Sequence, residues 1–502
     1  MNRSVVRLFG VMFLMFAVLV GWTSRWTVFK ATALNNDPLN KLSYYASLKV
    51  KRGTIYAADG QILAKSVRGS AVTWKRVYPE GSLFAQEVGY FNAAQGQISG
   101  LEEARNTDLT GKQNPLTNLF GSFNGTAAVG NDVHTSLDPK AQALAKRLLA
   151  GRVGAVVAIV PQTGEVKVMY SNAVAGDNYN DNDPSACLKD TGRCSELNYA
   201  TQAELPPGST FKLVTTTAAL DSGKYTPTSV INGHGPITVA SRPLENNAGE
   251  QYGNVTLTYA LTNSINVVYA KVGMALGSTV MQDYMQRYGF YSYPPLDYPA
   301  DQMVISGERF YPGNCGNHTA GPVLRPVTSA CVDLGRTSIG QANLAVTPLQ
   351  MAMVVEAIAD NGTLMEPRFT TQVLNQYGQS VDSATPQVYS QVMKPQTAQE
   401  LQAMMRDVVE EGTGASANLE GLAIAGKTGT ASLGRCSKGP LAANGSCPDG
   451  ESLDDAWFVG FPESDPKIAV AVELSGIPNG YGGQYAAPIA AQVIKMLLAE
   501  GQ

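Results

Sequence analysis

A serine and a lysine three residues apart are the first groups in this sequence that could carry out chemistry. Ser209 follows two prolines and a glycine and opens a predicted helix, and Lys212 lies one turn further along the same helical face. A serine at a helix N-terminus lies at the positive end of the helix dipole, which stabilises a nearby oxyanion. A lysine whose pKa is lowered by desolvation or by a neighbouring cation can accept the serine proton. The pair indicates a nucleophile and its base, although a capping serine with a surface lysine has the same spacing.

Two further triplets carry polar groups suited to the same chemistry. Ser264–Asn266 precedes an apolar predicted helix, and Lys427–Gly429 lies inside a predicted strand. Glycine in a strand leaves room for a ligand backbone, and lysine with threonine can bind a carboxylate. Each pattern is weak alone, since Ser-x-x-Lys recurs at 464–467 and Ser-x-Asn at 122–124 and 416–418. In this order and in these contexts, the three together predict a serine acyl-transferase site.

Composition argues against several other classes of function. The sequence has 37 Lys and Arg against 41 Asp and Glu, a formal net charge of −4, which disfavours nucleic acid as the main partner. Its three histidines, His134, His234 and His318, are far apart, which disfavours a multi-histidine metal centre. The stretch 412–417 fits a dinucleotide-binding fingerprint, but it follows a helical run and lacks the strand that this motif needs.

The elements that must position these motifs form an α+β pattern. A helix is predicted over 139–149, and a second over 486–498. Five apolar runs predict strands, at 154–160, 165–171, 421–431, 456–461 and 467–474. Their apolar content predicts one antiparallel sheet with helices on both faces, and the intervening 250 residues are expected to be largely helical.

The first 134 residues are expected to form two separate regions. Residues 1–30 contain an uncharged stretch, Leu8–Ser24, of a length that can span a bilayer as a helix, so we expect a cytoplasmic stub and a transmembrane anchor. A cleaved signal peptide is the alternative, helped by the small residues 31–33. Residues 31–134, with a strand–turn–strand signal at 50–66, are expected to form a small β-rich module. The main domain then covers 135–502.

The six cysteines fall into three pairs that are close in sequence. These pairs are Cys187 with Cys194, Cys315 with Cys331, and Cys436 with Cys447. Six cysteines allow fifteen pairings, but the local set closes its loops with the least entropy, while free buried thiols are the alternative. Disulfides form in oxidising compartments, so we expect the N-terminus on the cytoplasmic side of the membrane and the body on its outer side.

The chain resembles class B penicillin-binding proteins, which are peptidoglycan D,D-transpeptidases. The resemblance rests on the three motifs and on the stretches 52–64, 154–166, 338–352, 425–431 and 456–461. Residues 76–96 and the compact N-terminal module are similar to penicillin-binding protein A of actinobacteria. The chain has Ile265 where some β-lactamases carry aspartate. Too few residues separate the anchor from the main domain for a glycosyltransferase region, which argues against the class A type.

The resemblance implies a transpeptidase fold like that of serine β-lactamases, and a serine acyl-enzyme mechanism. Ser209 would attack the D-Ala-D-Ala carbonyl of a stem peptide and expel the terminal D-alanine. Lys212 would be the general base, and Ser264 would pass a proton to the leaving amine. An amine on a neighbouring peptidoglycan strand would then attack the acyl-enzyme and form the cross-link. β-Lactams would acylate the same serine, and no metal or organic cofactor is implied.

The other motif residues would bind the substrate. Asn266 would hold the donor amide, Lys427 would supply positive charge, and Thr428 would bind the terminal carboxylate. Gly429 would allow close approach, and the backbone N–H groups of Ser209 and Thr430 would form the oxyanion hole. A β-lactamase or D,D-carboxypeptidase would share the first step, and a catalytically idle sensor or scaffold is the rival from another class.

Two expectations go beyond the motifs. The disulfide Cys436–Cys447 lies on the loop that leaves the Lys-Thr-Gly strand, so we expect it to stiffen one lip of the site. In the anchor, Gly10, Ala17 and Gly21 fall on one helical face, which lets another helix approach closely. The resemblance names a polytopic glycosyltransferase of the RodA/FtsW kind as the partner, while chance is the plain alternative.

Overall fold

A central antiparallel sheet organises the larger part of the molecule. The computed structural model describes residues 3–26, 47–70, 73–111, 129–177, 179–184, 194–310, 322–440, 447 and 450–500. Five strands follow the spatial order β20-β21-β22-β7-β8, with bounds β7 Gly154–Ile159, β8 Val166–Asn172, β20 Ile424–Cys436, β21 Ser452–Pro462 and β22 Ala469–Pro478. The five predicted strands and their antiparallel arrangement are therefore confirmed.

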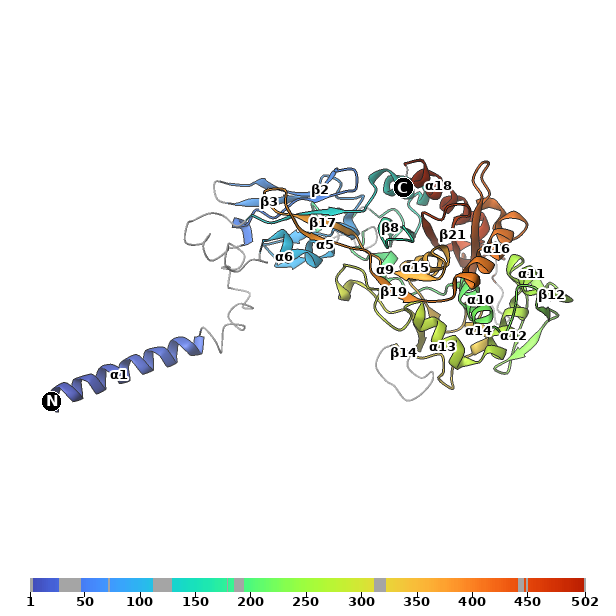
Figure 1. The fold of residues 1–502 in the computed structure, drawn as a ribbon, viewed down its shortest axis with the longest axis horizontal. Coiled ribbons are helices and arrows are strands. Elements are labelled where there is room, and N and C mark those ends of the chain that lie inside the picture. The colour runs from blue at the N-terminus through green and yellow to red at the C-terminus, as the bar shows by residue number, and fades with distance from the viewer. Residues whose placement is uncertain are drawn as a thin grey trace.

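Both faces of this sheet are covered, which explains the continuous apolar runs. Along β7, Val157 and Ile159 contribute to one core cluster, whereas Val156 and Ala158 contribute to the other. Helix α15 (Pro348–Ala359), buried along its whole length, packs on one face. On the other lie α18 (Ala487–Ala499) and α8 (Pro139–Leu149) (Figure 1). The Asp138 side chain caps the first turn of α8.

The segment between β8 and β20 is more mixed than predicted. It contains α10 (Lys212–Asp221), α11 (Leu257–Thr262), α12 (Asn266–Leu276), α13 (Ser278–Arg287) and α16 (Pro395–Glu410). Short strand pairs interrupt these helices, including β9–β12 (Val230–Asn232 with Asn254–Thr256) and β10–β11 (Ile237–Val239 with Arg242–Leu244). The expectation of a largely helical segment was wrong, because strands of three residues are too short to show a period-2 pattern.

The N-terminal module has its own sheet, and the chain returns to it from the main domain. The predicted hairpin is confirmed as β1 (Ile55–Tyr56) and β2 (Ile62–Arg68), with β3 (Trp74–Val77) beside β2 and β6 (Asp132–Thr135) beside β1. Strands β17 (Thr370–Leu374) and β18 (Ser380–Ser383) complete the order β18-β17-β6-β1-β2-β3 (Figure 1). Residues 370–383, from the main domain, thereby join the two parts.

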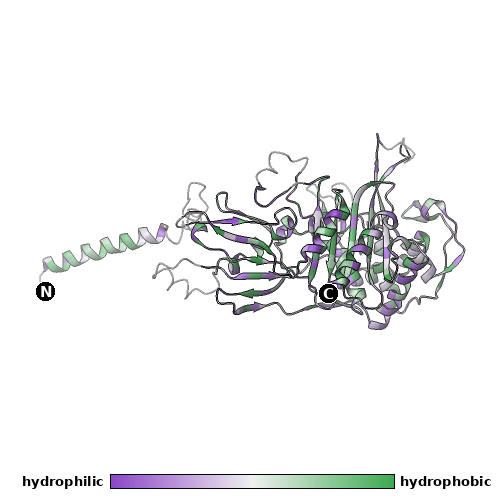
Figure 2. Cartoon of the chain, turned by 90° about the horizontal axis from the view of Figure 1, so that it is seen from above, coloured by the Kyte–Doolittle hydropathy of each residue, from purple (hydrophilic) through white to green (hydrophobic). Residues whose placement is uncertain are grey.

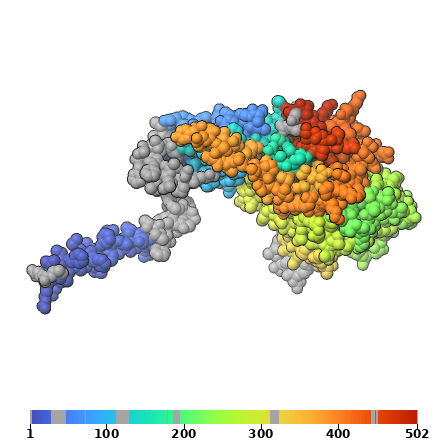
Figure 3. All heavy atoms as spheres, viewed as in Figure 1, coloured from blue at the N-terminus to red at the C-terminus, as the bar shows by residue number. Residues whose placement is uncertain are grey.

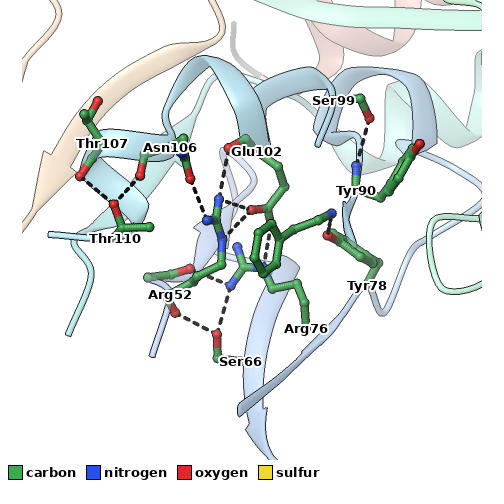
Figure 4. Close-up of polar contacts among 12 residues, drawn as sticks. Arg52, Ser66, Arg76, Tyr78, Tyr90, Ser99, Glu102, Asn106, Thr107 and Thr110 are labelled. Carbon is green, nitrogen blue, oxygen red and sulfur yellow. Dashed lines mark hydrogen bonds and ion pairs between the residues drawn. The ribbon is translucent and has the colours of Figure 1, made fainter. Parts of the chain in front are cut away.

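A buried ion-pair network stabilises the N-terminal module. Glu102, on α5 (Gly100–Ala104), lies fully buried between two arginines (Figure 4). The Arg52 guanidinium donates to the Glu102 carboxylate at 2.6 Å, and Arg76 makes a second ion pair with the other carboxylate oxygen. Burial by itself raises the pKa of Glu102, but the charges of Arg76 and Arg52 outweigh that effect and lower it.

Helix α1 (Arg3–Ser24) is long and apolar enough to cross a membrane, and none of its residues is buried within the molecule. Figure 2 shows its hydrophobic colouring along most of its length, and Figure 3 shows its side chains apart from the body. An exposed apolar surface of this extent matches a lipid environment rather than water.

Candidate active site

The turn that carries Ser209 is fixed between the sheet and a glycine loop. Ser209 lies half-buried in the 3-10 turn Gly208–Phe211, which leads directly into α10. Gly208 has a φ of +52°, and a Cβ there would lie 2.6 Å from the Thr430 carbonyl oxygen. Its N–H donates to the Gly340 carbonyl oxygen at 3.0 Å. The close approach of the Ser209 turn to Thr430 therefore requires glycine at position 208.

The second residue of this motif, Lys212, reaches into the centre of the site. Its Nζ donates to the Ser264 carbonyl oxygen at 2.7 Å, to Asn266 Oδ1 at 2.8 Å and to Ser264 Oγ at 3.1 Å. Lys427 Nζ lies 3.1 Å from the same Ser264 Oγ. The Ser264 hydroxyl therefore lies between two amines, one from α10 and one from β20.

Local backbone geometry sets the Ser264 position. Ser264 ends the turn after α11 and adopts a φ of +57°, which is unusual for a residue with a Cβ. Asn266 then begins α12, and its Nδ2 donates to the Glu245 carbonyl oxygen at 3.2 Å. The strained turn lets the serine hydroxyl and the asparagine amide face the Lys212 amine together.

Burial and proximity change the acidity of both amines. Lys212 and Lys427 are each 0% exposed, and within the described residues neither has an ion-pair partner. Desolvation, followed by repulsion from Lys427, holds the pKa of Lys212 well below its ordinary value. Desolvation lowers the pKa of Lys427 to about 7. The lowered pKa favours the neutral form of Lys212, which is the form that can accept a proton.

The Lys-Thr-Gly strand forms one wall of the site. Gly429 allows β20 to approach the Ser209 turn, because a Cβ there would lie 2.8 Å from the Pro207 carbonyl oxygen. Trp457, opposite Gly429 on β21, donates from Nε1 to the Pro206 carbonyl oxygen at 3.1 Å. The sheet thereby fixes both the turn and the Lys427 amine.

The structure places all eight predicted site residues around this junction of α10, the α11–α12 turn and β20. Lys212, Ser264, Asn266 and Lys427 are linked directly by the hydrogen bonds described above. Gly429 packs against Pro207 and Thr210, on either side of Ser209, and Thr428 and Thr430 flank Gly429 on the same strand. Thr430 Oγ1 accepts a 3.3 Å hydrogen bond from the Gly482 N–H.

Sequence reasoning missed two contributors. One is Gly340, in the loop that receives the Ser209 turn. The other is Thr413, whose Oγ1 lies 2.6 Å from Thr428 Oγ1. Thr413 belongs to the glycine-rich stretch 412–417 that fits a dinucleotide fingerprint. The glycines on either side of Thr413 were the sequence feature that could have indicated close packing of this loop. Among the described residues, no group of three His, Cys, Asp or Glu is placed to hold a metal.

One predicted disulfide is present at the far end of the strand that carries the Lys-Thr-Gly motif. Cys436 and Cys447 are bonded, with their Cα atoms 5.4 Å apart, and Cys436 forms the last pair of β20 with β21, opposite Ser452. Strands β20 and β21 are longer than predicted, because they stay paired, together with β22, beyond the end of β7. Cys194 and Cys331 are also disulfide-bonded, and their expected partners, Cys187 and Cys315, lie outside the described residues.

Comparison with known proteins places this geometry in context. Residues 154–495 match the family described as penicillin binding protein transpeptidase domain, and residues 52–133 match the penicillin binding protein A dimerisation domain. The peptidoglycan D,D-transpeptidase PbpA of Mycolicibacterium smegmatis is 29% identical over 100% of both chains. The protein of the same name from Mycobacterium tuberculosis is 29% identical over 99% of each.

Solved structures agree with these matches. The ceftriaxone acyl-enzyme of penicillin-binding protein A from M. tuberculosis superimposes with a TM-score of 0.74 at 27% identity, covering 90% of this chain and 99% of that one. Its penicillin G acyl-enzyme gives a TM-score of 0.72 at 27% identity, covering 89% and 100%. A D,D-transpeptidase domain from Eggerthella lenta gives 0.74 at 28% identity, covering 90% and 99%.

Proposed function

Because the chain belongs to the family of penicillin-binding protein transpeptidase domains, we propose that it cross-links peptidoglycan through an acyl-enzyme on Ser209. The reaction is D,D-transpeptidation of stem peptides that end in D-Ala-D-Ala, and β-lactams inhibit it by acylating the same site. The observation that carries the proposal is the Ser264 hydroxyl held at 3.1 Å from both buried amines. This arrangement supplies a proton acceptor and a proton relay next to the serine turn.

In the acylation step, Ser209 Oγ attacks the carbonyl carbon of the penultimate D-alanine, and its proton passes to neutral Lys212. The backbone N–H groups of Ser209 and Thr430 stabilise the oxyanion of the tetrahedral intermediate. Support for this placement comes from Gly208, whose backbone approaches that of Thr430. The intermediate collapses when its C–N bond breaks and the leaving D-alanine amine takes a proton through Ser264.

Binding of the substrate uses opposite charge and hydrogen bonds. The terminal carboxylate lies against Thr428, with the positive charge of Lys427 nearby, and Asn266 holds the donor amide. In the second step, an amine on a neighbouring peptidoglycan strand attacks the ester carbonyl of the acyl-enzyme. Its proton returns through the same base, Ser209 is released as the alcohol, and a new amide bond forms the cross-link.

The decisive experiment presents the purified full-length protein in detergent with a stem peptide ending in D-Ala-D-Ala and an amine acceptor. Mass spectrometry of the products separates amide formation from hydrolysis. We expect the cross-linked amide and free D-alanine, and neither with Ser209→Ala. Hydrolysed peptide alone would instead identify a D,D-carboxypeptidase, and no product at all would contradict the transpeptidase and leave a β-lactamase or an idle scaffold.

We also propose an orientation for α1 and a membrane partner, the latter suggested by the family. The disulfide in the body supports an extracytoplasmic catalytic domain, with the N-terminus in the cytoplasm. Gly10 and Gly21 have open space around them, which lets another helix approach α1 closely. A polytopic glycosyltransferase of the RodA/FtsW kind is the partner. Replacing Ala17 and Gly21 with leucine should weaken co-purification of such a partner, and unchanged co-purification would exclude this face.

A further inference from the structure

The loop 412–414, between α16 and the Lys-Thr-Gly strand, touches both sides of the active site. We propose that Thr413 is a positioning residue that aims the Thr428 hydroxyl at the substrate's terminal carboxylate and so contributes to selection of substrates that carry this carboxylate. The inference rests on the proposed function, because it concerns the carboxylate that Thr428 binds there. It assigns a role to a residue outside the three motifs.

Thr413 is held from both sides by hydrogen bonds. Its N–H donates to the Thr262 carbonyl oxygen at 3.3 Å, at the end of α11 and two residues before Ser264. Its Oγ1 lies 2.6 Å from Thr428 Oγ1 on β20. The one residue therefore joins the segment that carries the proton relay to the strand that binds the carboxylate.

Neighbouring glycines fix the loop at this position. A Cβ on Gly412 would lie 2.4 Å from the Thr262 carbonyl oxygen, and a Cβ on Gly483 would lie 2.3 Å from the Thr413 carbonyl oxygen. The loop backbone therefore approaches Thr262 on one side and Gly483 on the other so closely that only glycine fits at positions 412 and 483. A loop packed in this way holds its side-chain hydroxyl in a constant place relative to β20.

A bound carboxylate decides which hydroxyl donates in the hydrogen bond between Thr413 and Thr428. Each threonine hydroxyl has one proton to donate and can also accept. A carboxylate only accepts, so Thr428 must turn its proton towards the ligand, and Thr413 must then donate to Thr428. Lys427 Nζ also donates towards Thr428 Oγ1, at 3.4 Å. Two donors behind Thr428 leave it with its own proton free for the carboxylate and strengthen that hydrogen bond.

The different exposure of Thr413 and Thr428 agrees with this positioning role. Thr428 is 5% exposed, whereas Thr413 is exposed on the outer side of the same hydroxyl pair. A ligand that covers Thr428 would exclude water from the pair, so that Thr413 could no longer be replaced by solvent. Loss of the Thr413 hydroxyl should then matter most for ligands that have the carboxylate.

The test compares two thioester analogues of the stem-peptide end, one with a free terminal carboxylate and one with a carboxamide. The second-order rate constant of acylation is followed by thiol release with the full-length protein in detergent. For Thr413→Val we expect about a tenfold loss with the carboxylate, the typical effect of one missing hydrogen bond, and less than about twofold with the carboxamide. Thr413→Ser should restore the rate.

Two controls make the result decisive. Thr363→Val removes a hydroxyl that contacts Gln391 away from the site, and it should leave both rates unchanged. A double variant of Thr413→Val and Thr428→Val should be no slower than Thr428→Val alone, since the two hydroxyls act through one contact. Equal losses with both analogues, or fully additive losses, would overturn the inference. A wild-type protein that reacts with neither analogue would refute the proposed function instead.

Discussion

Gly340→Ala should displace the nucleophile while leaving the fold intact. A Cβ at this position would lie 1.8 Å from the Gly208 carbonyl oxygen, whereas real contacts of this kind stay above 3.0 Å, so the two segments must separate by 3.0 − 1.8 = 1.2 Å. Gly208 immediately precedes Ser209 on the same 3-10 turn. A misplacement of about 1 Å in an active site can reduce a rate by about 10²-fold.

Gly378 offers a matched control, because it separates displacement from backbone strain. Gly340 has a φ of +77° and Gly378 a φ of +76°, but a Cβ on Gly378 would have nothing within 4 Å. Alanine in this left-handed conformation costs about 1–2 kcal/mol at either site. Both variants therefore share the strain, and only Gly340→Ala also moves the turn that carries Ser209.

The assay is acylation by penicillin G, followed as the mass increase of the intact protein, with circular dichroism and thermal unfolding as checks of the fold. We expect a second-order rate constant about 100-fold below that of the wild type for Gly340→Ala, and one within about twofold for Gly378→Ala. If folded Gly340→Ala acylates within about threefold of the wild type, the close fit between Gly340 and the nucleophile turn does not control reactivity.

Three further predictions concern protons, the disulfide and the N-terminal module. Acylation should fall above about pH 7 as Lys427 loses its charge, and at low pH as Lys212 gains a proton. Lys427→Gln removes the charge that repels protonated Lys212, so it should raise the pKa of Lys212 and move the acid limb of the pH–rate profile to higher pH. An unmoved acid limb would contradict the electrostatic coupling of the two lysines. Cys436→Ser removes a loop constraint that contributes about 3 kcal/mol of conformational free energy, so it should make the β20–β21 hairpin more mobile and slow acylation. Unchanged hydrogen exchange in the hairpin together with an unchanged rate would show that the disulfide does not stiffen the site. Glu102→Gln leaves two buried arginines without their counter-ion and should lower the free energy of unfolding by about 3–5 kcal/mol, with normal acylation by the folded protein; loss of acylation while the fold persists would show that the module controls the site.

Local signals in the sequence predict much of this fold. Helix α8 begins where Asp138 caps it and Pro139 occupies the first position, and both features are visible in the sequence. The five sheet strands are continuous apolar runs between turn residues, so their type and limits are largely local properties. Where β20, β21 and β22 continue past the end of β7, the polar composition hides the continued pairing, and the sequence prediction ended too early.

Contacts between distant segments were beyond reach of the same reasoning. Strand β17 pairs with β6 across more than two hundred residues, for example Val373 with Val133, and no pattern within either strand encodes that choice of partner. The site shows the same limit. The three motifs marked Ser209, Ser264 and Lys427, but Thr413 enters the site through the packing of its loop, which only the tertiary structure defines.

The central claim, an acyl-enzyme on Ser209, is tested most directly by locating the adduct. The full-length protein in detergent is incubated with penicillin G, its intact mass is measured, and peptide mapping identifies the modified residue. The account predicts one stable adduct per chain, on Ser209, and none with Ser209→Ala. An adduct on another residue, or one that persists in Ser209→Ala, would contradict it.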